Sequence, residues 1–173
     1  MSFIKRLFRR KRKEKVEEKV EEKVEEKKEE MVSEPKVTVK VVEKIPTFKE
    51  RLAEILSSEI VAKSALDVGD VKIQFVAGSE SLYIESVGRI GAKKLEISEG
   101  RTSNPDIFVR ISEAAALDLA KTKSYDEFTT LLKEFMKRSS PDRYVKVNCL
   151  KSIDELRSKG YLNVDLLKIF AMA

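Results

Sequence analysis

Apolar and polar residues alternate along five short segments of the chain, which are 71–75, 82–85, 94–98, 107–111 and 144–148. A period of two with many β-branched residues is typical of a strand that buries one face. The first four segments follow one another, and glycine-containing turns separate them. We therefore expect an antiparallel meander with one face open to solvent, to which the fifth segment adds a strand.

The remaining apolar residues recur at helical spacing, and each predicted helix begins at a residue that favours an N-cap. One helix is expected over 48–62, two follow the fourth strand over 114–120 and 125–136, and helical turns follow the fifth strand. Capping-box pairs begin three of these segments: Thr47 with Glu50, Ser124 with Glu127, and Ser152 with Glu155. The apolar stripes are Phe48, Leu52, Ile55, Leu56 and Ile60, then Phe128, Leu131, Leu132, Phe135 and Met136, and finally Leu162, Leu166, Leu167 and Phe170.

Strands grouped together, with helices on one face, predict an α+β domain of two layers. Its sheet is expected to be five-stranded and antiparallel, with the helices packed on one face. We place this domain at 47–173, after a basic arm at 1–13 and a charged spacer with a joint at 14–46. The one cysteine, Cys149, follows inward-facing valines and is expected to be a small buried hydrophobe.

The arm, MSFIKRLFRRKRK, carries seven basic residues and no acidic one. A short basic amphipathic helix is typical of an interfacial membrane anchor, and each basic residue adds about 1 kcal/mol of attraction to an anionic bilayer. Two other interpretations stay open, an inert basic tail and a nucleic-acid-binding arm. The anchor would consist of Phe3, Ile4, Leu7 and Phe8 on one face, with Lys5, Arg6, Arg9 and Arg10 supplying charge.

The spacer begins with a low-complexity stretch, 14–30, in which VEEK repeats three times. A period of four stacks like charges at i, i+4, and its valines are too sparse for a coiled coil, so we expect a solvated spacer. A second interpretation is that its glutamates keep the basic arm off the membrane until lipid competes. The joint at 31–46 is either an added edge strand or an extended linker.

Histidine is absent and cysteine occurs once, which excludes Ser-His-Asp and Cys-His catalysis, zinc sites that contain histidine, and thiolate metal sites within one chain. The glycines of 88–91 lack the strand-to-helix setting of a phosphate loop. We therefore expect no enzyme activity, no cofactor and no metal. Lysine and glutamate dominate and glutamine occurs once, a bias seen in hyperthermophile proteins.

No apolar run is long enough to cross a bilayer, and no signal-peptide core follows the basic start. We expect a cytoplasmic protein, peripheral on the inner face of the membrane.

The order of elements resembles the sterol-binding domain of the sterol carrier protein family, over roughly residues 48–170. The likeness rests on the leading amphipathic helix, the sequence NPDIFVRIS at 104–112, and the two short helices that follow it. It implies a non-catalytic domain in which sheet and helices enclose an apolar tunnel for a fatty acyl, isoprenoid or sterol-like ligand. The candidate pocket residues are Phe75, Leu82, Ile84, Phe128, Leu132, Phe135, Leu167 and Phe170.

These candidates would line a tunnel or fill a solid core equally well. The leading hypothesis is a membrane-associated lipid-binding protein, with an anionic membrane surface and a lipid ligand as its partners. The alternative is a membrane-tethered interaction module with a solid core, which recruits a protein partner. Nucleic-acid binding through the arm is least favoured, because the chain without the arm is close to neutral.

Overall fold

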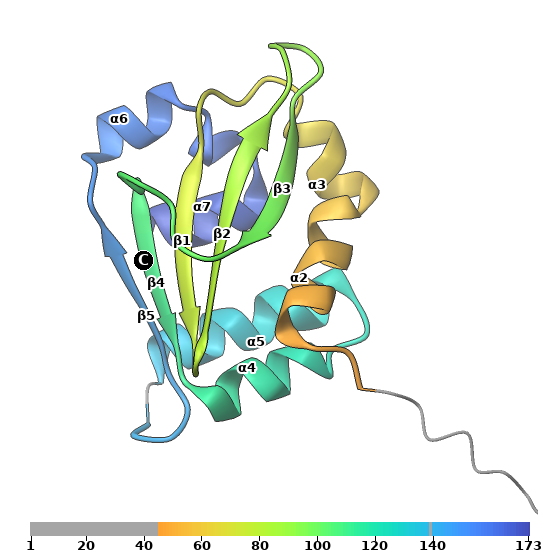
Figure 1. The fold of residues 1–173 in the computed structure, drawn as a ribbon, viewed down its shortest axis with the longest axis vertical. Coiled ribbons are helices and arrows are strands. Elements are labelled where there is room, and N and C mark those ends of the chain that lie inside the picture. The colour runs from red at the N-terminus through yellow and green to blue at the C-terminus, as the bar shows by residue number, and fades with distance from the viewer. Residues whose placement is uncertain (1–44, 139) are drawn as a thin grey trace, which may run out of the picture. The chain divides into compact units, whose positions relative to one another are not determined.

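The computed structural model describes residues 45–138 and 140–173, so the arm at 1–13, its anchor residues and most of the spacer and joint lie outside the described residues. Figure 1 shows the fold. Its elements are α2 (Phe48–Ser57), α3 (Glu59–Ser64), β1 (Lys72–Ala77), β2 (Glu80–Val87), β3 (Lys94–Glu99), β4 (Ile107–Ile111), α4 (Glu113–Ala120), α5 (Tyr125–Lys137), β5 (Val145–Cys149), α6 (Ile153–Ser158), the 3-10 turn η1 (Tyr161–Asn163) and α7 (Asp165–Ala171).

The α+β class is confirmed, but the five-stranded sheet is mixed, and the expectation of a purely antiparallel sheet was wrong. Its strand order is β3-β2-β1-β4-β5. Strands β1 and β4 run parallel, with Ile73 opposite Ile107, whereas the other three pairings are antiparallel. The connection 100–106 does not turn back beside β3. It crosses the sheet instead, and brings β4 to the far side of β1 (Figure 1).

Gln74 holds this crossing connection against the helix-free face of the sheet. Its Nε2 donates to the carbonyl oxygens of Leu82 at 2.8 Å and Gly100 at 3.1 Å, and its Oε1 accepts from the Thr102 amide at 2.8 Å. Gln74 is buried although it faces away from the core. The connection therefore has a specific polar anchor on the strand that it crosses.

The helices pack on the opposite face, with α7 behind the strands and α4 and α5 across their lower ends in Figure 1. The core between the layers is built around phenylalanine rings. Phe75 of β1 has its ring centroid 6.4 Å from that of Phe48 and 5.5 Å from that of Phe170. Phe128 stacks on Phe48 at 6.5 Å. One contiguous cluster of buried side chains joins the sheet to the helical layer.

The single helix expected over 48–62 is broken at Ser58, where the backbone is extended with ψ 147°. The Ser58 hydroxyl donates to the Ile55 carbonyl at 2.7 Å, which gives a hydrogen-bond partner to a carbonyl in the last turn of α2. Because α3 starts on a new axis, Ile60 leaves the buried stripe and is 55% exposed, so its expected burial was wrong. The expected capping boxes of Thr47 and Ser152 are confirmed.

Two local expectations about the later elements need correction. Ser124 accepts from the Glu127 amide, but the Glu127 carboxylate accepts from the Lys123 amide and does not close the box. Cys149 is exposed, although burial in a hydrophobic setting was expected. It ends β5, which within residues 45–138 and 140–173 has a neighbouring strand on one side only. Partial desolvation still raises the pKa of its thiol.

Candidate functional site

The eight candidate pocket residues all belong to the buried core. They belong to one contiguous cluster of buried side chains, and none lines the groove described below. Phe135 is the most exposed of them, at 8%. The eight residues are Phe75, Leu82, Ile84, Phe128, Leu132, Phe135, Leu167 and Phe170.

A groove of about 810 Å³ lies where α5, β5 and α7 meet. Strand β5 forms the left-hand edge of the sheet in Figure 1, and the groove runs between this strand and the ends of the two helices. A volume of this size is within the range of small-molecule sites. It is lined by Lys133, Met136 and Lys137 from α5, Val145, Lys146 and Val147 from β5, and Ile169, Met172 and Ala173 at the end of the chain. We call this the lysine groove.

Helix α5 supplies one wall because its amphipathic stripe is wider than the core can cover. Phe135 packs inward, whereas Met136 beside it is only partly buried and reaches the groove. Lys133 and Lys137 are four residues apart and so share one side of α5, and both line the groove with Met136. The opposite wall has the same form, since Phe170 of α7 is buried and its neighbour Ile169 lines the groove.

The charged side chains that line the lysine groove are all of one sign. Its lining residues are apolar ones and three lysines, of which Lys133 and Lys137 come from α5, and among the described residues no carboxylate side chain lines it. Among the described residues, none of the three lysines forms an ion pair. Lys146 instead lies over the Tyr144 ring, with Nζ 5.2 Å from the centroid. The arrangement suits a molecule with an apolar body and a negative charge.

Positive charge continues from the groove onto the helix-free face. Lys146 of β5 lies directly opposite Arg110 of β4. Like charges at directly opposed positions of a sheet repel each other. Neither residue pairs with a carboxylate in the part of the chain that the structure describes. The edge of the sheet beside the groove therefore has two uncompensated cations.

A buried polar cluster lies around Asp106, which precedes β4 and is 1% exposed. Its carboxylate accepts from Lys159 Nζ, from Tyr161 Oη at 2.9 Å and from the Lys72 amide at 3.1 Å. Burial, and next the Asp106 charge, raise the pKa of the Tyr161 hydroxyl far above its ordinary value of 10.0. Every carboxylate oxygen has a partner here, so the cluster acts as a structural joint.

Two further features bear on chemistry. Within residues 45–138 and 140–173, no group of three or more Cys, Asp or Glu side chains is placed to hold a metal ion. In the same residues, no helix combines the length and the apolar character that crossing a membrane requires.

The sequence predicted the orientation of several residues that line the groove, but it did not predict the groove itself. Met136 was expected on the apolar stripe of its helix, and Val145 and Val147 on the inward face of the last strand. No sequence pattern marked the lysines as part of a binding site, because surface lysines flank most amphipathic helices. The missing information was how α5 and α7 pack against the edge strand β5.

Comparison with known proteins gives little identification. No family model matches the chain, and no curated protein is detectably similar to it. A solved structure from Thermus thermophilus, a conserved hypothetical protein described as a candidate sterol carrier protein, aligns at 12% identity and a TM-score of 0.34. The alignment covers 72% of this chain and 84% of the other. At that score the likeness carries no argument about this chain.

Proposed function

We propose that the domain is a non-catalytic binding module for an anionic amphiphile of the lipid class, such as a molecule with an acyl or isoprenoid chain and an acidic head group. The observation that carries the proposal is the lysine groove, whose apolar walls are flanked by Lys133 and Lys137 and, among the described residues, by no carboxylate side chain. The apolar chain would lie against Met136 and Ile169, and the head group would meet Lys133 and Lys137.

The energetic argument rests on the apolar walls. Each methylene removed from water contributes about 0.8 kcal/mol, so a chain of which about eight methylenes are covered gains roughly 6 kcal/mol before ordering costs. The lysines add a smaller term, because exposed charges are screened by water and salt. We therefore expect the length of the apolar chain to set the affinity, and the charge to set the selectivity.

The groove is favoured over an interior tunnel by the packing of the core. The residues that would line a tunnel of the sterol-carrier kind belong to one buried cluster, in which the Phe75 and Phe170 ring centroids are 5.5 Å apart. Opening this core would expose apolar surface and lose close contacts, whereas the groove is already open. The non-catalytic part of the proposal rests on the absence of histidine from the sequence.

The proposal includes an anionic membrane as the surface from which the ligand comes. It rests on the basic amphipathic sequence 1–13, whose structure is not described. Sedimentation with anionic vesicles, with and without residues 1–13, separates membrane attachment from binding in the groove. Full-length protein is expected to sediment and the shortened protein to remain in solution.

The direct test is binding of full-length protein to dodecanoate, compared with dodecanol and dodecylamine as neutral and cationic molecules of equal chain length. We expect dodecanoate to bind most tightly. The double substitution Lys133→Gln and Lys137→Gln should weaken it by about three- to tenfold, because two exposed charges are lost. Lys168→Gln is the matched control, since Lys168 is an exposed lysine of α7 outside the groove. Equal affinity for the three amphiphiles, or equal loss in the control, would contradict the proposal.

A second candidate function is the membrane-tethered interaction module expected from the sequence. The packed core favours it, because such a module needs a rigid surface and no cavity. Its binding surface would lie at the edge of the sheet that β5 forms.

A further inference from the structure

Strand β5 has an open edge. It is the last strand of the sheet order and pairs with β4 alone. Among residues 45–138 and 140–173, no other strand pairs with its outer side. An unpaired edge presents a row of amide and carbonyl groups that can template another strand.

The register identifies which backbone groups point outward. The Ser112 amide donates to the Tyr144 carbonyl at 3.1 Å, and the Leu150 amide donates to the Asp106 carbonyl at 2.8 Å. In an antiparallel ladder the direction of the backbone groups alternates from residue to residue. Tyr144, Lys146, Asn148 and Leu150 therefore point towards β4, and the amides and carbonyls of Val145, Val147 and Cys149 point outward.

The two faces beside this edge differ in chemistry. Val145 and Val147 line the lysine groove, so a residue opposite either of them on an added strand would meet the apolar walls near Met136. A residue opposite Lys146 would lie on the helix-free face. There it would be beside the Lys146 ammonium group, which Arg110 already repels. A carboxylate at that position would relieve the repulsion, at about 0.2–1 kcal/mol per opposed pair.

We propose that the open edge of β5 binds an extended segment of an acidic partner protein by strand addition. The segment would alternate apolar residues, which enter the lysine groove, with glutamate or aspartate, which face Lys146. Its backbone would pair with the outward groups of Val145, Val147 and Cys149. This goes beyond lipid binding, because it uses backbone groups that an amphiphile in the groove does not need.

The positive charge at this edge disfavours two other strands as its partner. A second copy of β5 would bring another Lys146 to an edge that is already positive. The valine-rich segment 36–42 of the same chain alternates its valines with lysine and threonine, so it also adds positive charge. Edge lysines commonly prevent a sheet from pairing with its own copies. An acidic strand can still pair there, because its carboxylates attract the lysine.

The test is amide hydrogen exchange of the full-length protein, resolved by residue, with a short peptide that alternates valine and glutamate. In the free protein we expect fast exchange at Val147 and Cys149 and slow exchange at Lys146 and Asn148, as the register requires. The peptide should slow exchange at Val147 and Cys149 by at least tenfold. A peptide with lysine in place of glutamate should leave both unchanged. Protection by both peptides, or by neither, would overturn the proposal.

A proline substitution isolates the backbone contribution. Val147→Pro removes one outward amide without breaking a bond to β4, a position where an edge strand tolerates proline. We expect peptide affinity to fall about tenfold relative to Val147→Ala, which keeps the amide. Lys146→Glu keeps all backbone groups and should reverse the preference between the two peptides. Equal affinity of the proline and alanine variants, with the preference unchanged in Lys146→Glu, would overturn the proposal.

Discussion

Single residues with several partners determine how the layers of this fold are joined. Asp106 accepts three hydrogen bonds, from Lys159, Tyr161 and the Lys72 amide, and so connects the start of β4 to β1 and to the turn before α7. Asp106 stands directly before the predicted strand 107–111, and β4 does begin at Ile107. The burial of Asp106 was not predictable, because two of its partners lie more than fifty positions away in sequence.

The Tyr161 hydroxyl yields a prediction about alkaline stability. Burial and the Asp106 charge raise its pKa in the folded protein, so the unfolded chain loses this proton first as the pH rises above about 10. The unfolded state then binds fewer protons, and the free energy of unfolding falls by about 1.4 kcal/mol per pH unit. This stabilising contribution is fully present below pH 10 and is lost above it.

Tyr161→Phe removes the titration and provides the comparison. At neutral pH it should lower the free energy of unfolding by about 1 kcal/mol, because the bond to Asp106 is lost. Urea unfolding at several pH values should show the gap between wild type and variant closing above pH 10. A gap that stays constant up to pH 11 would show that the hydroxyl titrates normally.

At the scale of elements, the sequence predicted the strands well and one of their pairings wrongly. Alternating residues identify a strand and its buried face but carry no direction, and a connection such as 100–106 resembles the loop of a hairpin. The structure places it across the sheet, with Gln74 beneath it. The one glutamine of the chain, between two apolar strand residues, was the signal that could have indicated a polar anchor.

Gln74→Leu tests that anchor. Leucine keeps the approximate volume of glutamine but leaves the Thr102 amide and the Gly100 carbonyl without their partner. We expect a loss of about 1–3 kcal/mol in the free energy of unfolding, with faster exchange of the Thr102 amide. Ser98→Ala, on the same face of β3, should change stability by less than about 0.5 kcal/mol. Unchanged exchange at Thr102 in Gln74→Leu would mean that other contacts hold the connection.

At the scale of the whole molecule, the core could be predicted and the groove could not. Periodicity identified residues such as Phe135 and Phe170 as buried, and both are. Their neighbours Met136 and Ile169 line the lysine groove instead, one position away in sequence on the adjoining side of each helix. The groove forms where α5, β5 and α7 come together after the chain has folded. That is a property of the assembled layers, and no local pattern encodes it.

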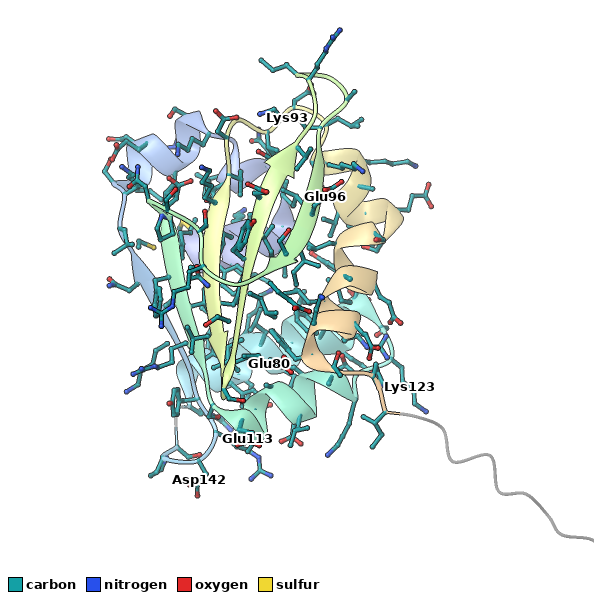
Figure 2. The ribbon with its side chains drawn as sticks, viewed as in Figure 1. Glu80, Lys93, Glu96, Glu113, Lys123 and Asp142 are labelled. Carbon is teal, nitrogen blue, oxygen red and sulfur yellow. The ribbon has the colours of Figure 1, made fainter. Side chains whose placement is uncertain are left out.

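Figure 2 shows charged side chains such as Glu113, Lys123 and Asp142 around the outside of the domain, and the lysine groove differs from such surroundings in having no carboxylate side chain in its lining.

The central claim is that the ligand lies in this groove and not in the core. Methyl-resolved NMR of the full-length protein during titration with dodecanoate tests it most directly. We expect the signals of Met136, Ile169 and Met172 to shift, while those of Leu82, Ile84 and Leu167 stay unchanged. Shifts at the core methyl groups without shifts in the groove would contradict the account and favour an interior tunnel.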